Sequence, residues 1–136
     1  MSDYIAKQDI SLFVYDYDHN APDTEYLART HEAFFLNIRE KRPNLPVIMA
    51  SRTDSPKTQS IAYDTLRRRE IILKTYDNAL KRGDQNVQFV DGMHIFDKCS
   101  VLDVAADSCT VDGIHPNDLG FACMANAFEE VIRKML

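Results

Sequence analysis

Asp112 and His115 lie three residues apart in the stretch DGIHPND, directly before a helix that Pro116 is expected to open. A turn with this spacing lets the carboxylate accept a hydrogen bond from the Nδ1–H of the imidazole. The carboxylate then fixes the tautomer and stabilises the imidazolium, which leaves Nε2 to take a proton from a nucleophile. The same residues also fit a plain helix N-terminus with capping acids and a surface histidine. The spacing therefore supports a general base with its orienting acid as one of two interpretations.

Asn20 is the next residue whose type could take part in chemistry, because it ends the run Asp18-His19-Asn20 after a predicted strand. A side-chain amide held there could donate a hydrogen bond to the oxyanion of a tetrahedral intermediate. In the alternative interpretation the run is only a turn, since Asp and Asn side chains readily bond to their own backbone. Both interpretations stay open from these residues alone.

Three apolar stretches must supply the scaffold for these side chains. Each is rich in β-branched or aromatic residues and is followed by turn residues, which predicts a buried strand. The stretches are Ile10–Tyr17, Leu45–Ala50 and Asn86–Asp91. A helical pattern follows each one, so the order predicts an α/β fold with a parallel sheet and helices on its faces. In such sheets the chemistry lies at the carboxyl ends of the strands, which is where Asn20 falls.

Three helices are predicted from the periodicity of apolar residues. The first is capped by Asp23 or Thr24 and ends before Pro43, because proline cannot continue the hydrogen-bond ladder. Its apolar face comprises Leu27, His31, Phe34, Phe35 and Ile38. The second helix has a stripe formed by Leu66, Ile72, Leu73, Tyr76, Ala79 and Leu80. The third begins at Pro116 and Asn117, and its apolar face comprises Phe121, Met124, Ala125, Phe128, Val131, Ile132 and Met135.

The long connection from Gly92 to Gly113 precedes the Asp112–His115 pair, and a helical turn is expected near Val101–Ala105. Connections of this length are uncommon and often functional. Three parallel strands also make a sheet smaller than usual, and its first strand would have an open edge. We therefore interpret residues 1–136 as a single partial domain, the second half of an α/β domain.

Composition excludes several classes of protein. The chain has 136 residues, 45% of them hydrophobic and 27% charged, which is typical of one globular domain. A net charge of −5 argues against a nucleic-acid binder. No apolar run is long enough to span a membrane. The N-terminus lacks the features of a signal peptide, which leaves the compartment open.

Two further groups of residues have simple interpretations. Cys99, Cys109 and Cys123 contain no CxxC pair, so we expect free thiols rather than a disulfide framework. The run Arg67-Arg68-Arg69 on the second helix is expected to be a solvated face whose aliphatic stems cover apolar surface. An anion or partner site is the alternative for this run.

Taken together, the motifs resemble the SGNH hydrolases, the GDSL-like esterase and lipase superfamily. The resemblance is to the branch with a YDHN-type third block and a DGxHPNDxGxxxMA-type last block. It covers nearly the whole chain, through VYDYDHNAP, THEAFFLNIREKRPNLPVIMASR, RRREIILKTY and DGIHPNDLGFACMANA. It implies a flavodoxin-like three-layer α/β/α sandwich of five parallel strands, here reduced to about three. It also implies a bacterial enzyme that hydrolyses carboxylic or carbohydrate esters with no metal or cofactor.

The resemblance assigns roles by position. The oxyanion-hole asparagine of the family falls on Asn20, the catalytic histidine on His115 and the supporting aspartate on Asp112. The family's nucleophilic serine and its glycine donor have no counterpart, since both belong before Asp9 in family order. We therefore expect the C-terminal part of a serine ester hydrolase with little or no activity as this chain alone. Ser51 follows a strand but has no adjacent base, which makes it a weak substitute nucleophile.

A phosphatase of the haloacid-dehalogenase type is a rival interpretation. The stretch VYDYD resembles the first motif of that family, with Asp16 as nucleophile and Asp18 as acid. Ser51 and Lys74 would supply its second and third motifs. The acids Asp112 and Asp118 would hold the Mg²⁺ that this chemistry needs to bridge carboxylate and phosphate.

A zinc site and a non-enzymatic module are two interpretations that need no protein nucleophile. The zinc site would use His19, His94 and His115 with Asp18 or Asp112, but no two of these histidines have the spacing of a metal motif. The non-enzymatic module would use its surface for association. Because edge strands pair with other chains, such a module is expected to form a homodimer through Ile10–Tyr17.

Overall fold

The computed structural model describes residues 1–53, 59–96 and 106–136. Its strands are β1 (Phe13–Tyr15), β2 (Val47–Ala50) and β3 (Val87–Val90). Its α-helices are α1 (Ser2–Ile5), α2 (Thr24–Lys41), α3 (Gln59–Lys81) and α4 (Asp118–Met135). Short 3-10 helices occupy Asp18–Asn20, Gly92–His94 and Ala106–Cys109. The helical turn expected near Val101–Ala105 lies outside the described residues.

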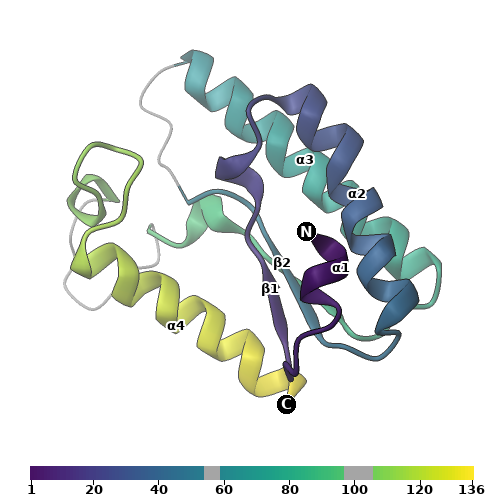
Figure 1. The fold of residues 1–136 in the computed structure, drawn as a ribbon. Coiled ribbons are helices and arrows are strands. Elements are labelled where there is room, and N and C mark those ends of the chain that lie inside the picture. The colour runs from purple at the N-terminus through teal and green to yellow at the C-terminus, as the bar shows by residue number, and fades with distance from the viewer. Residues whose placement is uncertain (54–58, 97–105) are drawn as a thin grey trace.

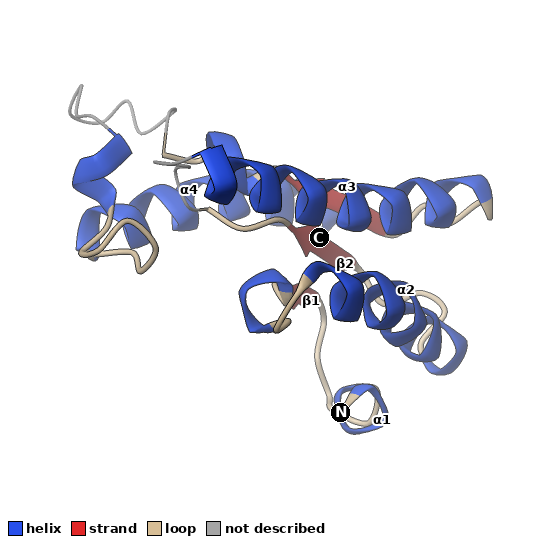
Figure 2. Ribbon diagram, turned by 90° about the horizontal axis from the view of Figure 1, so that it is seen from above, coloured by secondary structure: helices blue, strands red, loops and turns tan. Residues whose placement is uncertain are grey.

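The strands form a parallel sheet in the order β1-β2-β3. Helices α2 and α3 cover one face of this sheet, and α4 covers the other (Figure 1). The short helix α1 lies against α2, on the β1 side of the molecule (Figure 2). The prediction of a partial three-layer α/β/α sandwich with a three-stranded parallel sheet is therefore confirmed.

The strand β1 is shorter than the apolar stretch Ile10–Tyr17 that predicts it. Its three residues pair with the first three residues of β2, with Phe13 opposite Val47 and Tyr15 opposite Met49, and Ala50 of β2 has no partner in β1. After Tyr15 the chain leaves the sheet and turns into the 3-10 helix Asp18–Asn20. Apolar character is a property of each residue, whereas β1 ends where the chain turns away from β2 and can no longer bond to it.

Several aromatic rings pack on the face of the sheet under α2 and α3, beside aliphatic side chains. Tyr15 lies at the centre of this cluster, and its ring stacks on those of Phe34 and His31 at centroid distances of 5.0 and 4.4 Å. The Nδ1 atom of His31 lies 2.9 Å from Oγ1 of Thr75 on α3. These contacts join strand, α2 and α3 around a fully buried imidazole.

Helix α2 matches its prediction closely. Asp23 is the N-cap residue, and its side chain accepts a hydrogen bond of 2.7 Å from the backbone N–H of Tyr26. The helix ends at Lys41, before Pro43. Its buried residues are Leu27, His31, Phe35 and Ile38. The periodicity of the apolar residues and the N-cap residue therefore predict this helix correctly.

Helix α3 departs from its prediction in the face that it buries. It begins at Gln59, before the predicted stripe, and both Leu66 and Leu80 at the ends of that stripe are exposed. From residue 64 onward its buried residues are Thr65, Arg68, Ile72, Thr75 and Ala79. The predicted stripe is wrong at its ends because three polar side chains occupy the interior, and Arg68 and Thr75 find bonding partners there.

Helix α4 begins after its N-cap Asn117, whose side chain accepts a hydrogen bond of 3.1 Å from the backbone N–H of Gly120. Most of its predicted apolar face packs against the sheet, but Phe121 is 58% exposed and Ala125 is exposed as well. No helix in the described part of the chain is both long and apolar enough to cross a membrane.

The expectation of free thiols is only partly correct. Cys109 is a buried free thiol, whereas Cys123 on α4 is disulfide-bonded. Cys99 lies outside the described residues. An odd number of cysteines still permits one bond, and spacing along the chain does not reveal which thiols folding brings together.

Candidate active site

The His115 imidazole and the Asp112 carboxylate form a close pair. Nδ1 of His115 lies 2.6 Å from Oδ2 of Asp112. The other carboxylate oxygen, Oδ1, accepts hydrogen bonds from the backbone N–H groups of Ile114 at 2.9 Å and His115 at 2.8 Å. With Nδ1–H donating to the carboxylate, Nε2 is the nitrogen left to accept a proton, and the His115 side chain is 74% exposed.

These bonds hold the Asp112 carboxyl in its ionised form. Its pKa lies well below the usual range, chiefly because the backbone N–H of His115 donates to the charged form. The His115 side chain and the backbone N–H of Ile114 lower the pKa of this carboxyl further. An ionised partner is what a histidine base requires to keep one tautomer and to tolerate a positive charge.

The loop that carries the pair is closed by its own backbone. Thr110 and Pro116 form an antiparallel bridge, and the N–H of Val111 donates to the carbonyl of His115 at 2.9 Å. Gly113 lies at the tip of the loop with a φ of 91°, a backbone conformation that residues other than glycine rarely adopt. The motif DGIHP therefore describes a tight loop, and its glycine is needed for the turn.

Gly120 fixes this loop to the first turn of α4. A Cβ atom added at Gly120 would lie 2.1 Å from the carbonyl oxygen of Cys109. The same carbonyl accepts a hydrogen bond of 3.0 Å from the N–H of Asn117. The backbone at Cys109 therefore approaches the helix so closely that only glycine fits.

Asn20 ends the 3-10 helix that follows β1, and it lines the same cavity as His115. This cavity has a volume of about 720 Å³ and lies at the carboxyl edge of the sheet. We call it the site groove; its walls also include Asp16, His19, Arg52 and Phe121. The fold thus brings together all three residues that the sequence predicted, from two loops far apart in the chain.

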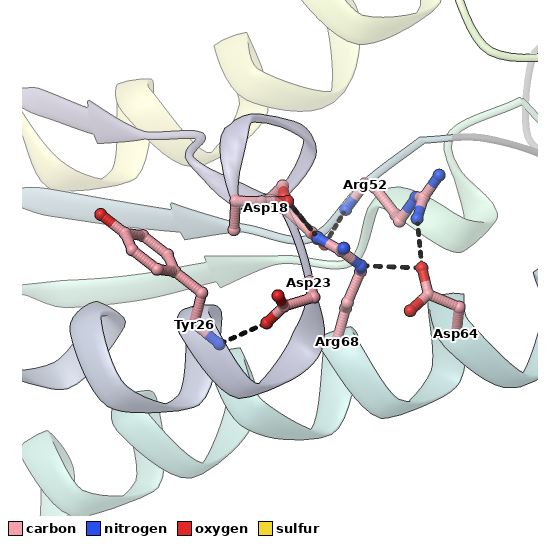
Figure 3. A network of polar contacts seen from close by, with 7 residues as sticks. Asp18, Asp23, Tyr26, Arg52, Asp64 and Arg68 are labelled. Carbon is pink, nitrogen blue, oxygen red and sulfur yellow. Dashed lines mark hydrogen bonds and ion pairs between the residues drawn. The ribbon is translucent and has the colours of Figure 1, made fainter.

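A buried arginine, Arg68, is the site residue that sequence reasoning missed. Its Nη1 donates to the carbonyl oxygens of Asp18 at 2.8 Å and Ala21 at 3.1 Å, so it holds the loop that carries Asn20. Asp18 is itself fully buried, and its Oδ2 accepts a hydrogen bond of 2.8 Å from the backbone N–H of Arg52. Figure 3 shows this network from α3 to the loop.

The expectation of a solvated arginine face is therefore wrong for two of its three residues. Only Arg67 is exposed. Arg69 forms an ion pair of 2.6 Å with Asp91 at the end of β3. Arg68 lies on the same helical face as Ile72 and Thr75, four and seven residues ahead. That spacing is the one feature of the sequence that indicates its burial.

Two carboxyl groups in or beside the site groove have raised pKa values. Burial raises the pKa of Asp18, against the effects of Arg52 and Arg68. Although Asp16 as a residue is exposed, protein surrounds its carboxyl group, and this desolvation raises its pKa against the opposing charge of His19. Carboxyls that retain a proton to higher pH can donate as well as accept hydrogen bonds.

Ser51 does not face the site groove. It is buried, and its Oγ accepts a hydrogen bond of 3.0 Å from the N–H of Gly92 while lying 3.5 Å from Oδ1 of Asp91. Its hydroxyl joins the ends of β2 and β3. Lys74, which the phosphatase interpretation would use, lies on α3 rather than in the walls of the site groove. Within the described ranges no three His, Cys, Asp or Glu side chains are grouped so that they could hold a metal ion.

Comparison with known proteins gives the following similarities. The model of the GDSL-like lipase/acylhydrolase family matches residues 1–133. No curated protein matches the sequence. A protein from Bacteroides ovatus ATCC 8483 described as GDSL-like lipase has a similar crystal structure, with a TM-score of 0.82 and 24% identity. The salicylyl-acyltransferase SsfX3 of a tetracycline biosynthetic pathway has a TM-score of 0.74 and 19% identity.

Both solved structures are longer than this chain. Each similarity covers 98% of the present chain, but only 38% of the Bacteroides ovatus protein and 40% of SsfX3. At these identities the likeness concerns the fold.

Proposed function

The chain belongs to the GDSL-like lipase/acylhydrolase family, and from this premise we propose that Asn20, Asp112 and His115 form the base and oxyanion half of a serine ester hydrolase site. The observation that carries the proposal is the joining of Asn20 and His115 in one cavity, with His115 bonded to an ionised Asp112. A base, its orienting acid and an oxyanion donor are three of the four parts that such chemistry needs.

In the proposed reaction Nε2 of His115 takes the proton of a serine hydroxyl as its oxygen attacks the ester carbonyl. The bond between serine oxygen and carbonyl carbon forms, and the carbonyl oxygen becomes an oxyanion to which Asn20 donates. His115 then gives the proton to the departing alcohol, and an acyl-serine remains. In the second half Nε2 of His115 takes a proton from water as the water oxygen attacks the acyl carbon. The bond between serine oxygen and acyl carbon then breaks, the serine oxygen takes the proton from His115, and the carboxylic acid leaves. Asp112 stabilises the imidazolium in each half and stays ionised throughout.

The serine is proposed to come from outside these 136 residues. No serine is among the described residues that line the site groove, and the Ser51 hydroxyl is bonded elsewhere. Because the members of a triad act as a unit, loss of the nucleophile removes most of the rate. The substrates we propose are small carboxylic or carbohydrate esters, which the mixed polar and apolar wall of the groove would accommodate.

The proposal is tested with the 136-residue chain, p-nitrophenyl acetate and a fluorophosphonate probe. We expect no labelled serine and only slow, imidazole-type hydrolysis. This slow rate should be lost in His115→Ala and kept in the control His94→Ala, since His94 is not part of the site groove. A labelled serine with turnover lost in His115→Ala would show that the nucleophile lies in this chain. Turnover of p-nitrophenyl phosphate that EDTA abolishes would favour the phosphatase interpretation.

We also propose a homodimer through β1. The outer edge of β1 pairs with no strand among the described residues, and Val14 in its centre is 38% exposed. An open edge offers backbone N–H and C=O groups to a second copy. Pairing across a two-fold axis would extend the sheet without further change.

Sedimentation at micromolar concentration should give twice the chain mass of 15.6 kDa. A charge in the open edge opposes such pairing, so Val14→Lys should return the mass to that of one chain. The control Val111→Lys changes a residue that is 72% exposed on the site loop and should leave the dimer intact. A single-chain mass for the unchanged protein would contradict the proposal.

A further inference from the structure

We infer that Arg68 is a positioning residue for Asn20, fixing the backbone on both sides of it; this inference rests on the proposed role of Asn20 as an oxyanion donor. Asp18 precedes Asn20 by two residues and Ala21 follows it directly. Their carbonyl oxygens both accept hydrogen bonds from the same atom, Nη1 of Arg68, at 2.8 and 3.1 Å. The loop therefore bends around one nitrogen, with Asn20 between the two attachment points.

The Asn20 side chain depends on this support for its direction. Its backbone N–H donates to the carbonyl of Tyr17 at 3.0 Å, but its side-chain amide makes no hydrogen bond to any described residue. The direction of that amide is thus set by the backbone of residues 18–21. An oxyanion donor contributes most when it is held in place before the reaction, so the contact that holds this backbone is part of the site.

The guanidinium is itself held firmly in place. Its Nε donates to Oδ2 of Asp64 at 2.8 Å, and the same oxygen accepts from Nη1 of Arg52 at 2.9 Å. Figure 3 shows Asp64 between the two arginines. The Arg68 side chain is only 7% exposed, and the Asp18 carboxylate lies 3.5 Å from its Nη1. Two arginines and two aspartates thus alternate, so the buried charge has partners of opposite sign.

Only arginine fits these contacts. The planar guanidinium carries donors in fixed directions, so one edge can meet Asp64 while Nη1 meets two carbonyls. A lysine ammonium is a single point of charge and would reach fewer of these acceptors. The neighbouring Arg67 is exposed on the same helix and provides a matched control.

The experiment compares Arg68→Met, Arg68→Lys and Arg67→Met by NMR. Backbone amide exchange is measured at Asn20 and Ala21, with Ile48 in the central strand as reference. We expect Arg68→Met to raise exchange at Asn20 and Ala21 by at least about tenfold relative to Ile48, because the loop loses both attachment points. In Arg68→Lys the exchange rates at Asn20 and Ala21 should lie between those of Arg68→Met and those of the unchanged protein. In Arg67→Met they should match those of the unchanged protein. If Arg68→Met does not fold, the Lys variant provides the same comparison.

A second measurement follows the side-chain amide signal of Asn20 as methylphosphonate, a mimic of the tetrahedral oxyanion, is added. In the unchanged protein and in Arg67→Met this signal should move, whereas in the Arg68 variants the movement should be lost or weakened. Loop exchange and Asn20 signals that are unchanged in the Arg68 variants would overturn the inference. If the loop responds to Arg68 but methylphosphonate never moves the Asn20 signal in the unchanged protein, the proposed oxyanion role fails while the positioning of the loop stands.

Discussion

The free energy of unfolding is expected to fall by about 3 kcal/mol as the pH is lowered from 6.5 to 4, because of His31 alone. Burial lowers the pKa of His31 from 6.5 to about 4. Between these values the imidazole of the unfolded chain binds a proton and that of the folded protein does not. The contribution of His31 to stability is therefore fully present above pH 6.5 and is lost as the pH falls to about 4.

The structure explains why His31 resists protonation. Its ring is stacked on Tyr15, its Nδ1 contacts Thr75, and its Nε2 has no partner among the described residues. The Thr75 hydroxyl also donates to the carbonyl of Ile71 at 3.3 Å, which leaves its oxygen free to accept from Nδ1–H. A second proton would go to Nε2, where the aromatic cluster offers it no acceptor.

Urea unfolding measured across this pH range tests the prediction. His31→Asn keeps a polar atom near Thr75 but removes the titrating group, so its stability should depend less on pH. Thr75→Val keeps the imidazole and removes its partner, so it should lower stability throughout while preserving the steep decline. An equal decline in the unchanged protein and in His31→Asn would assign the loss to carboxyl groups instead.

Alanine at position 120 is expected to lower the free energy of unfolding by about 2 kcal/mol or more. In a helix interior alanine is favoured over glycine by about 1 kcal/mol, which sets an upper limit for the gain at Gly120 in the first turn. Here the new Cβ would lie 2.1 Å from the carbonyl oxygen of Cys109, which is backbone and cannot rotate away. Overpacking of this kind costs about 3 kcal/mol, which exceeds the gain in helix propensity.

The expected damage extends beyond stability to the site loop. Displacing Cys109 would lengthen its bond to Asn117 and loosen the bridge between Thr110 and Pro116. Amide exchange at Val111 in Gly120→Ala should therefore rise more than at Val87 in the sheet. The reverse change Ala122→Gly, at an exposed position of the same helix, should cost only the propensity difference. A Gly120→Ala protein as stable as the original would mean that the loop does not press against α4.

Much of the site's local geometry could be predicted from the sequence. Asp112 and His115 are close because they lie three positions apart in a tight loop, and Asp23 and Asn117 cap helices through bonds within a single turn. Such contacts depend on neighbours in the chain, so their spacing is sufficient to predict them. The resemblance of the stretch DGIHPNDLG to its family also has a physical basis, since the positive φ of Gly113 favours glycine and a Cβ atom would not fit at Gly120.

The strands and helices could also be predicted from the sequence, but the tertiary contacts of their side chains could not. Alternating strands and helices predicted the parallel sheet, because burial on both faces leaves a continuous apolar run. The face that α3 buries depends on how the helix packs against α2 and against the loop that carries Asn20. This packing gives Arg68 and Thr75 buried hydrogen-bond partners, which lie too far away in the sequence to be predicted from a local pattern. The same holds for Cys123, whose bonded state depends on which thiol folding brings near it.

The types of the chemical groups, the loop that joins Asp112 to His115 and the order of the elements could therefore be predicted from the amino-acid sequence. Tertiary packing is needed to bring Asn20 and His115 into one groove, to place Arg68 against the loop of Asn20 and to hold His31 neutral. The difference lies in the range of the interactions. Bonds within a turn are fixed by spacing, whereas burial and desolvation depend on segments that meet only when the sheet and its helices pack together.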